Sequence, residues 1–372
     1  MYKQTLKAIM ALLFSGSATI GLAGNDTMLL HSGWKFRQAG HSEWHPATVP
    51  GVVHTDLMDN GLIEDPYYRL NERSLQWIDK EDWIYEVSFD AGALTRGYEH
   101  IRLEFLGLDT YADVFLNETQ ILTADNMFRR WAAEVKPLLK ERGNVLRIYF
   151  HSPIKKALPQ YESLPYRYEA WNDQADNGGL AGKKLSPFTR KAGYHYGWDW
   201  GPRLVTSGIW RPVKLQGWNS LRLEDVFHHQ HEVSQETARV ETQVEIEAAA
   251  PVENAVITVS DGKRVLGSRS VQLHVGMNRV SVPFTIDNPK LWWCRGMGEP
   301  YLYTFRTAVE QGGRVLAGHS TQVGLRSVTV EKKPDAYGRS LRFLLNGEPV
   351  FCEGANYIPC DCFLPRITPE TY

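Results

Sequence analysis

Hydrophobic and polar residues alternate in short runs along most of the chain. In residues 82–89 the large apolar side chains occupy every second position, which indicates a strand with one buried face: Trp83, Tyr85, Val87 and Phe89. Similar runs, separated by turn residues, cover 100–106, 111–116, 144–150 and 209–215. Short strands at this spacing predict a β-sandwich, with one helix at residues 54–60 between a Pro-Gly pair and a glycine.

The pattern changes at about residue 219, where tryptophan becomes rare and Val, Thr, Arg and Glu alternate. This texture predicts a second, smaller sandwich of immunoglobulin type over 219–331, with strands at 239–247, 255–260, 278–284, 301–310 and 321–330. The first sandwich is then a domain of residues 24–218. Two or three domains are expected for a chain of 372 residues.

The sequence pattern of residues 332–372 predicts the beginning of a third domain. A hairpin is expected over 341–352, with Asn346-Gly347 at its turn. The run 353–359 is expected to form a strand that carries Asn356 near its end. Thr368 and Pro369 then predict the first turn of a helix at 367–372. Because that helix stops before its second turn, we interpret the chain as the truncated N-terminal part of a longer protein.

The first 23 residues have the sequence features of a signal peptide. Lys3 and Lys7 precede the apolar run 9–14, and Gly21-Leu22-Ala23 fits the small-x-small rule for cleavage. A buried N-terminal helix is the alternative. The interpretation predicts export and a mature chain starting near Gly24, periplasmic or secreted, or lysosomal in a eukaryote. No segment approaches the ~20 apolar residues of a membrane span.

Composition excludes several classes of partner. A formal net charge of −2 with interspersed signs gives no reason to expect nucleic acid or an anionic membrane surface. The four cysteines form no disulfide framework, and no histidine after residue 319 completes a metal site near them: Cys294, Cys352, Cys360 and Cys362. The histidines at 228, 229 and 231 have no matching second pair, which favours a solvated strand face over zinc. We therefore expect neither metal nor cofactor.

Trp198-Asp199-Trp200 is the stretch with the most evident chemistry. It lies in a segment with glycines at 193, 197 and 201, a spacing that favours a loop. Indole faces can stack on the C–H face of a pyranose, while a carboxylate accepts hydrogen bonds from vicinal hydroxyls. The alternative is a packed corner in which Asp199 caps a turn or pairs with Arg203. The long irregular stretch 157–189 leads into this loop, and such segments are usually functional.

Six groups of residues resemble glycoside hydrolase family two, and specifically the N-terminal portion of its exo-β-mannosidases. They are Val49-Pro50-Gly51-Val52-Val53-His54-Thr55-Asp56-Leu57, Asp65-Pro66-Tyr67-Tyr68, Asp125-Asn126-Met127-Phe128, Arg190-Lys191-Ala192, Gly197-Trp198-Asp199-Trp200-Gly201-Pro202 and Gly354-Ala355-Asn356-Tyr357-Ile358-Pro359. Two further stretches carry the resemblance, Pro289-Lys290-Leu291-Trp292-Trp293 and Tyr301-Leu302-Tyr303, and their Leu-Trp and Leu-Tyr pattern is shared across the whole family. The resemblance covers essentially everything after residue 23.

The resemblance implies a jelly-roll sandwich, an immunoglobulin-like sandwich and then a (β/α)₈ catalytic barrel, of which 332–372 would be the start. It implies that Asp199 contacts hydroxyls of the terminal mannose and that Trp198 and Trp200 wall the pocket. Arg190 would help to hold the loop or the carboxylate. Asn356 would lie where the first barrel strand opens on the active face. The substrates implied are β-mannosides and manno-oligosaccharides.

The chain departs from the family in one respect. Retaining glycosidases use two carboxylates, which in this family are glutamates on later barrel strands, and no glutamate here matches either motif. Glu353 is interpreted as a strand-end residue. No catalytic residue is therefore expected in the chain, which should be inactive without the missing barrel. A β-glucosaminide or β-galactoside specificity is the alternative within enzymes, and a non-catalytic carbohydrate-binding module is the alternative outside them.

Overall fold

The computed structural model describes residues 26–199, 201–262 and 264–372. These residues form two compact units, and the first joins residues Asp26–Trp218 with Gly354–Tyr372. The second is Asn219–Glu353. Residues 332–372, expected to begin a third domain, are thus divided between the two units. The predicted signal peptide and Trp200 lie outside the described residues.

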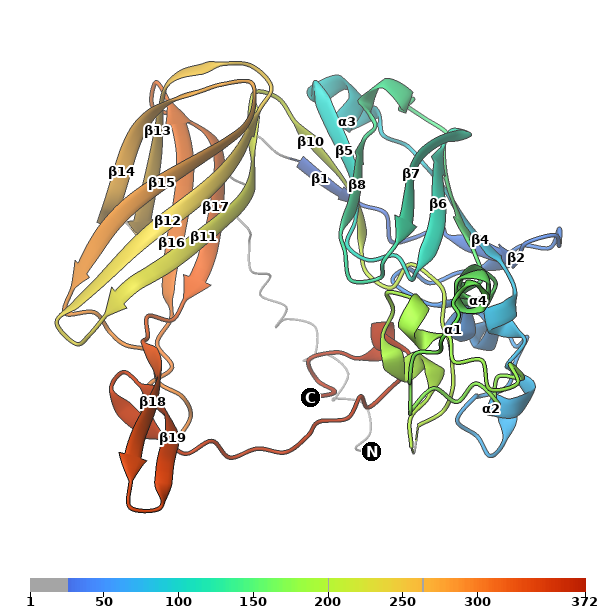
Figure 1. Ribbon diagram of the computed structural model, residues 1–372. Helices are drawn as coiled ribbons and strands as arrows, with labels where there is room; N and C mark the ends of the chain where they lie inside the picture. Colours follow the sequence, from blue (N-terminus) through green and yellow to red (C-terminus); the bar gives the residue numbers. More distant parts are fainter. Residues whose placement is uncertain (1–25, 200, 263) are drawn as a thin grey trace, which may run out of the picture. The chain divides into compact units, whose positions relative to one another are not determined.

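The first unit is built on two antiparallel sheets, and the mainly-β fold class is confirmed (Figure 1). The six-stranded sheet has the order β3-β2-β4-β9-β6-β7, with strands His45–Pro46, Lys35–Gln38, Trp83–Phe89, Asn144–Phe150, Tyr111–Leu116 and Thr119–Asp125. The four-stranded sheet has the order β1-β10-β5-β8, with strands Asp26–Leu29, Val213–Trp218, His100–Phe105 and Trp131–Glu134. The predicted strand at 209–215 begins late because Pro212 has no N–H to give to a ladder.

Alternating side chains from the two sheets fill the core between them. Tyr85 and Phe150 meet edge to face with ring centroids 5.6 Å apart, and Leu103 and Leu215 face them from the other sheet without measurable exposure. Aromatic and branched side chains of this size supply most of the hydrophobic stabilisation of a sandwich. The strand positions that carry them are those that the alternating pattern predicted.

Helices α1, α2 and α4 gather at one end of the sandwich, whereas α3 lies at the other end (Figure 1). The helices are α1 Val53–Asp59, α2 Asn71–Ser74, α3 Gly92–Gly97 and α4 Pro153–Ser163, with 3₁₀ turns η1 Ile78–Lys80, η2 Lys136–Leu138, η3 Ser186–Phe188 and η4 Gly193–Tyr196. The prediction of irregular structure from residue 157 was wrong as far as 163. Helix α4 starts with the Ser152 side chain accepting the Lys155 N–H at 3.1 Å and Pro153 at its first position.

Helix α1 is held against the sandwich by a buried carboxylate. Asp56 accepts hydrogen bonds from the Tyr85 hydroxyl at 2.6 Å and from the Thr48 N–H at 2.8 Å. Burial raises the pKa of Asp56 to about 7, although both donors favour the charged form. The helix that the sequence predicted at 54–60 spans 53–59, so it begins one residue earlier. It brings the ionisable side chain of Asp56 into the core.

The second unit is a smaller sandwich of antiparallel strands, as the sequence predicted. One sheet has the order β11-β12-β15 and the other β14-β13-β16-β17, with strands Leu221–Val233, Thr237–Ala248, Gly276–Asp287, Arg264–Leu273, Val252–Asp261, Tyr303–Gln311 and Arg314–Val323. The single strand expected over 321–330 is interrupted. Its residues Gly324 and Leu325 lie under Trp292, whose N–H donates to the Leu325 carbonyl at 2.8 Å.

A third sheet of the second unit is the hairpin region β18-β19-β20, with strands Val328–Asp335, Gly338–Leu345 and Glu348–Val350. Asn346 fastens it to the sandwich by donating to the Trp292 carbonyl at 3.0 Å and accepting the Ser327 N–H at 3.0 Å. Residues 351–363 form no strand, and 367–372 form a turn instead of a helix, with η5 at Leu364–Arg366. A strand is stabilised by pairing with neighbouring strands, and no strand within the described ranges pairs with residues 353–359.

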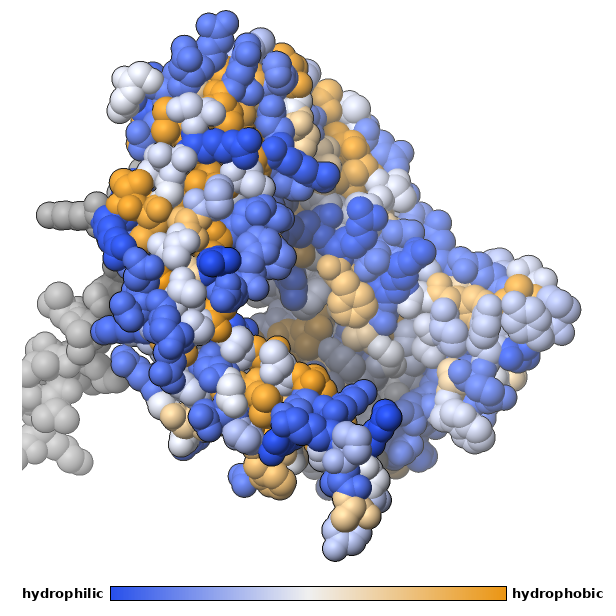
Figure 2. Space-filling view, turned by 60° about the vertical axis from the view of Figure 1, so that its left-hand side comes forward, coloured by the Kyte–Doolittle hydropathy of each residue, from blue (hydrophilic) through white to orange (hydrophobic). Residues whose placement is uncertain are grey.

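The surface shown in Figure 2 carries hydrophilic residues interspersed with small hydrophobic groups. Within the described ranges, no helix is long and apolar enough to cross a membrane. The histidines of β11 are divided between the two faces of the strand, because His228 is buried and hydrogen-bonded to Thr242 at 2.8 Å while His229 and His231 are exposed. The four cysteines are free.

Candidate functional site

Asp199 lies at the tip of a tight turn and points its carboxylate outward. The turn follows η4, with Gly197 at φ +93° and the Gly201 N–H donating to the Trp198 carbonyl at 3.2 Å. Asp199 is exposed, and its carboxylate has no hydrogen bond or ion pair within the part of the chain that the structure describes. It is therefore a free double acceptor. The alternative pairing with Arg203 is not found.

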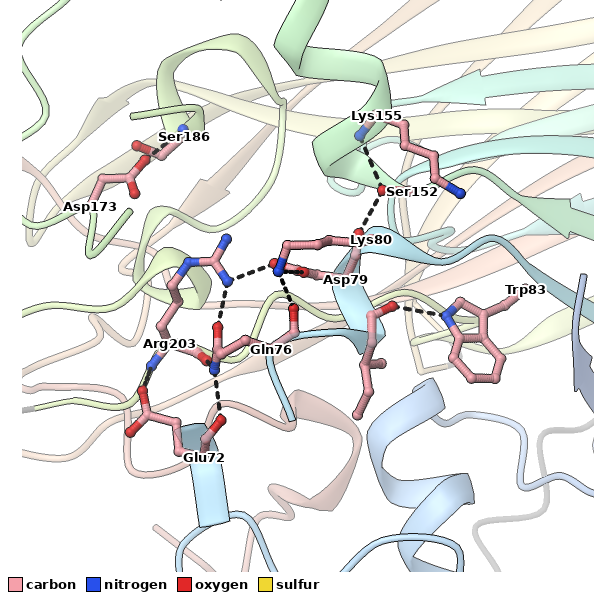
Figure 3. A network of polar contacts seen from close by, with 11 residues as sticks. Glu72, Gln76, Asp79, Lys80, Trp83, Ser152, Lys155, Asp173, Ser186 and Arg203 are labelled. Carbon is pink, nitrogen blue, oxygen red and sulfur yellow. Dashed lines mark hydrogen bonds and ion pairs between the residues drawn. The ribbon is translucent and has the colours of Figure 1, made fainter. Parts of the chain in front are cut away.

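Arg203 turns inward from the same loop and is 1% exposed. Its Nη1 donates to Asp79 Oδ2 and to Gln76 Oε1, each at 2.6 Å, and its carbonyl accepts the Gln76 amide at 2.8 Å (Figure 3). Its N–H donates to Glu72 Oε1 at 2.7 Å. Burial raises the pKa of Asp79, and Arg203 opposes that shift. The network joins the C-terminal side of the loop to α2 and η1.

Lys191 anchors the N-terminal side of the loop. Its fully buried ammonium contacts both carboxylate oxygens of Asp109 and donates at 2.9 Å to the carbonyl and hydroxyl of Thr206. Burial lowers the pKa of Lys191, which the Asp109 carboxylate counteracts. Burial, followed by the charge of Lys191, lowers the pKa of the neighbouring His54 to about 3. The loop is thus fixed by a buried charge at each end.

Trp198 packs into the loop. Its indole lies so close to Gly201 that a Cβ added there would fall 2.2 Å from the ring. It also packs against a small buried cluster formed by Val52, Leu204, Cys362 and Phe363. One side of this indole is thus used for packing, as the alternative interpretation expected.

Gln174 holds the turn from an irregular segment that precedes it in the chain. Its side-chain amide donates to the Trp198 carbonyl at 2.5 Å and to the Gly201 carbonyl at 3.3 Å. Its backbone N–H donates to the Tyr196 carbonyl at 2.9 Å. A Cβ on Gly197 would lie 2.7 Å from the Gln174 side chain, so glycine is required there for space as well as for its positive φ.

The last residues of the chain lie against this loop. The His195 ring is hydrogen-bonded to the Cys362 carbonyl at 3.0 Å, and Phe363 is fully buried. Tyr67 donates to Asp361 Oδ1 at 3.0 Å and accepts the Cys362 N–H at 2.9 Å. Burial lowers the pKa of His195 well below its ordinary value, so the ring is neutral. The loop bearing Asp199 and residues 361–363 therefore belong to one packed region.

Two predicted site residues lie apart from these contacts. Arg190 is exposed and pairs with Asp125 at 3.0 Å, so its guanidinium does not pair with Asp199. Only its main chain supports the loop, by accepting the Met127 N–H at 3.0 Å. Asn356 is exposed in a segment without secondary structure. The roles suggested for both residues remain predictions.

Sequence reasoning missed the residues that position the loop. Lys191 stands beside Arg190 in a group that carried the resemblance, but only Arg190 was given a role. Lysine is rarely fully buried, so the sequence alone does not indicate a buried Lys191. Gln174 and His195 carried no signal beyond their position in an irregular, aromatic-rich segment. The buried backbone N–H and C=O groups of so long a loop need hydrogen-bond partners, and this requirement could have pointed to polar side chains such as these.

The arrangement can bind but offers no acid–base pair. Asp199 supplies an acceptor for hydroxyl groups. The carboxylates of Asp79 and Asp109 are paired with the buried side chains of Arg203 and Lys191. No group of three or more His, Cys, Asp or Glu side chains that could hold a metal occurs within 26–199, 201–262 and 264–372.

Comparison with protein families matches both units. A galactose-binding domain-like model of glycosyl hydrolase 2 matches residues 34–211, and a model of glycosyl hydrolases family 2 matches residues 221–326.

Individual relatives extend the match over nearly the whole chain. β-Mannosidase B of Aspergillus oryzae is 35% identical over 352 residues, which are 92% of this chain and 40% of the relative. β-Mannosidase B of Thermothelomyces thermophilus is 35% identical over 350 residues, covering 92% of this chain and 39% of the relative. The chain thus spans about 40% of the length of the curated relatives it matches.

Solved structures give the same result. A β-D-mannosidase from Dictyoglomus thermophilum superposes with a TM-score of 0.83 at 38% identity, covering 93% of this chain and 42% of that one. An exo-chitosanase from Amycolatopsis orientalis superposes with a TM-score of 0.65 at 18% identity, covering 90% of this chain and 37% of that one, and shows a shared fold alone.

Proposed function

The chain belongs to glycoside hydrolase family 2, and from this we propose that it is the N-terminal part of a retaining exo-β-mannosidase. The complete protein would release terminal β-D-mannose from the non-reducing ends of glycans. The observation that carries the proposal is the 38% identity to a β-D-mannosidase over 93% of this chain, which includes both units.

We assign Asp199 to the subsite that holds the terminal mannose. Support comes from its exposed, unpaired carboxylate and from the buried charges that fix the loop on either side. A preorganised acceptor avoids the ordering that a flexible side chain would undergo on binding. The contact between the loop and residues 361–363 supports a position facing the domain that would follow in the longer protein.

The chemistry itself is assigned to residues beyond this chain. Hydrolysis with retention requires an acid/base carboxyl and a nucleophilic carboxylate about 5–5.5 Å apart. We propose that both are glutamates of a (β/α)₈ barrel following residue 372 and that residues 1–372 alone are inactive. No metal or cofactor takes part in the proposed reaction.

Substrate preference tests the proposal directly. The protein extended through its catalytic domain is assayed on aryl β-mannoside, β-glucoside, β-galactoside and β-glucosaminide. We expect the highest kcat/KM on the mannoside. A preference for β-glucosaminide or β-galactoside would replace the mannosidase assignment with the second specificity. Residues 1–372 alone are titrated with manno-oligosaccharides, and saturable binding would favour an independent binding module.

The role of Asp199 is tested by substitution. Asp199→Ala removes an acceptor of charged hydrogen bonds, each of which contributes roughly 1.5–3 kcal/mol, so kcat/KM should fall about 10- to 150-fold. Asp176→Ala is the matched control, because Asp176 is exposed in the segment that carries Gln174 and its carboxylate makes no hydrogen bond or ion pair with the described residues. Equal kcat/KM for the Asp199 variant and the unmodified protein would remove Asp199 from the sugar subsite.

Export is proposed from residues 1–23. The mature protein would begin near Gly24 and act in the periplasm, outside the cell or in a lysosome. Sequencing the N-terminus of the protein recovered from its natural host tests this, and a retained Met1 would contradict cleavage.

A further inference from the structure

We propose that Gln174 is the positioning residue of the Asp199 turn, holding the carboxylate in its binding orientation through the two peptide carbonyls that flank it. The inference deepens the proposed function and rests on the role assigned there to Asp199. Gln174 touches no sugar in this scheme and acts only through the turn.

The contacts of Gln174 bracket Asp199 on both sides. The same amide nitrogen donates to the carbonyl of Trp198, one residue before Asp199, and to that of Gly201, two residues after it. Its backbone N–H also holds the carbonyl of Tyr196 at 2.9 Å. Three carbonyls of one short loop thus depend on a single residue, which fixes the path of the chain through Asp199.

Only the neutral amide has the hydrogens that this arrangement needs. The two loop carbonyls are acceptors, so the NH₂ group must face them. Asn177 confirms this orientation, because its own amide donates to Gln174 Oε1 at 2.8 Å. A carboxylate at this position would keep the shape of the side chain, lose both donors and place a negative charge against two carbonyl oxygens.

Because the turn needs the amide hydrogens of Gln174, substitutions can distinguish a positioning role from simple filling of space. Gln174→Glu keeps the volume that packs against Gly197 and loses the donors, while Gln174→Ala loses both. If the donors hold the turn, Gln174→Glu is at least as damaging as Gln174→Ala at neutral pH. If volume alone matters, Gln174→Glu resembles the unmodified protein. Gln160→Glu is the matched control, because Gln160 is exposed on α4 and its side chain makes no hydrogen bond to the described residues.

The first experiment measures hydrogen exchange of the backbone amides of Gly197, Trp198, Asp199, Gly201 and Arg203 in the 372-residue chain, with circular dichroism confirming that each variant is folded. We expect exchange at Gly201 to accelerate about tenfold or more in Gln174→Glu and to stay unchanged in Gln160→Glu. Unchanged protection of Gly201 in both Gln174 variants would overturn the proposal.

The second experiment measures kcat and KM of the same variants in the protein extended through its catalytic domain. We expect Gln174→Glu to lower kcat/KM roughly 10- to 30-fold and to divide the loss between kcat and KM as Asp199→Ala does. The Gln174→Glu/Asp199→Ala double variant should match Asp199→Ala within about twofold, since Gln174 acts through Asp199.

The two arms distinguish the two proposals. A large effect of Asp199→Ala with no effect of Gln174→Glu would overturn the positioning role and leave the proposed function intact. Faster exchange in Gln174→Glu with no kinetic effect of either variant would remove Asp199 from the subsite, and with it the functional half of this inference.

Discussion

Replacing Lys191 by Met removes the cation from the best-buried ion pair of the first unit. The side chains of Lys191 and Asp109 are 0% and 1% exposed. Methionine keeps the length of the lysine stem and packs readily, so the substitution changes charge more than volume. After it, the Asp109 carboxylate stays buried with two hydroxyl donors, those of Thr206 at 2.7 Å and Thr110 at 2.5 Å, and without a cation.

The magnitude follows from burial. Removing one partner of a buried pair leaves an uncompensated charge and destabilises a protein by about 3–5 kcal/mol. At roughly 2–4 °C per kcal/mol for a unit of this size, the first unit should melt about 6–20 °C lower. Arg96→Met is the control, because Arg96 and Glu141 pair at 2.7 Å with side chains 64% and 59% exposed. An exposed pair of this kind contributes less than about 1 kcal/mol.

Tryptophan fluorescence reports on the unit concerned, since ten of the 12 tryptophans precede residue 220. Equilibrium urea unfolding followed at this signal should show a midpoint lower by about 1.5–2.5 M for Lys191→Met, taking an m-value of roughly 2 kcal/mol/M. The Lys191→Met/Asp109→Asn double variant should recover part of the loss, because it also removes the stranded charge.

A Lys191→Met midpoint equal to that of Arg96→Met would contradict this prediction. That result would mean that the ammonium and Asp109 lie in water, or that the loop relaxes enough to hydrate the carboxylate. A double variant less stable than the sum of its single changes would likewise contradict the view that the isolated charge is what destabilises.

Three further outcomes are expected. As pH rises from about 4 to 7 the folded Asp56 stays protonated while the unfolded one ionises, so stability should fall by up to about 4 kcal/mol, and Asp56→Asn should flatten that slope in pH-dependent urea titrations. Gly201→Ala places a methyl group inside the indole of the loop and should lower the melting temperature, whereas Gly193→Ala meets nothing within 4 Å and should not, as scanning calorimetry would show. Tyr67→Phe removes the hydrogen bonds of the Tyr67 hydroxyl with Asp361 and Cys362 and should speed proteolysis near these residues; an unchanged rate would mean that packing of the ring alone holds that segment.

The strands were the most predictable part of the fold. The sequence pattern located the strands 111–116 and 144–150 to the residue, because each has one buried face and the period of two follows directly from that. The helix α4 was missed in part because Pro159 lies inside it and turn-forming residues follow. The expected strand at 353–359 did not form because its pairing partners are not local in sequence.

The sequence indicated the candidate hydrogen-bond acceptor of the site, Asp199, but not the residues that hold its loop in place. Asp199 was a candidate because its carboxylate lies between two tryptophans in a glycine-rich segment, although the sequence left open whether it would pair with Arg203. Lys191 and Gln174 could not be predicted, because their partners at Asp109, Thr206 and the loop carbonyls are set by how distant segments meet. Such contacts are decided by tertiary packing, which a local pattern does not encode.

The contact of Tyr67 with Asp361 has a consequence for biosynthesis. The two residues are 294 positions apart, so at 5–20 residues per second a ribosome reaches Asp361 roughly 15–60 s after Tyr67. From the synthesis of Leu204 until that of Phe363, the nascent first unit leaves the binding surface of Phe363, which includes Val52 and Leu204, without this cover. Completion of the first unit is therefore timed by translation of the second.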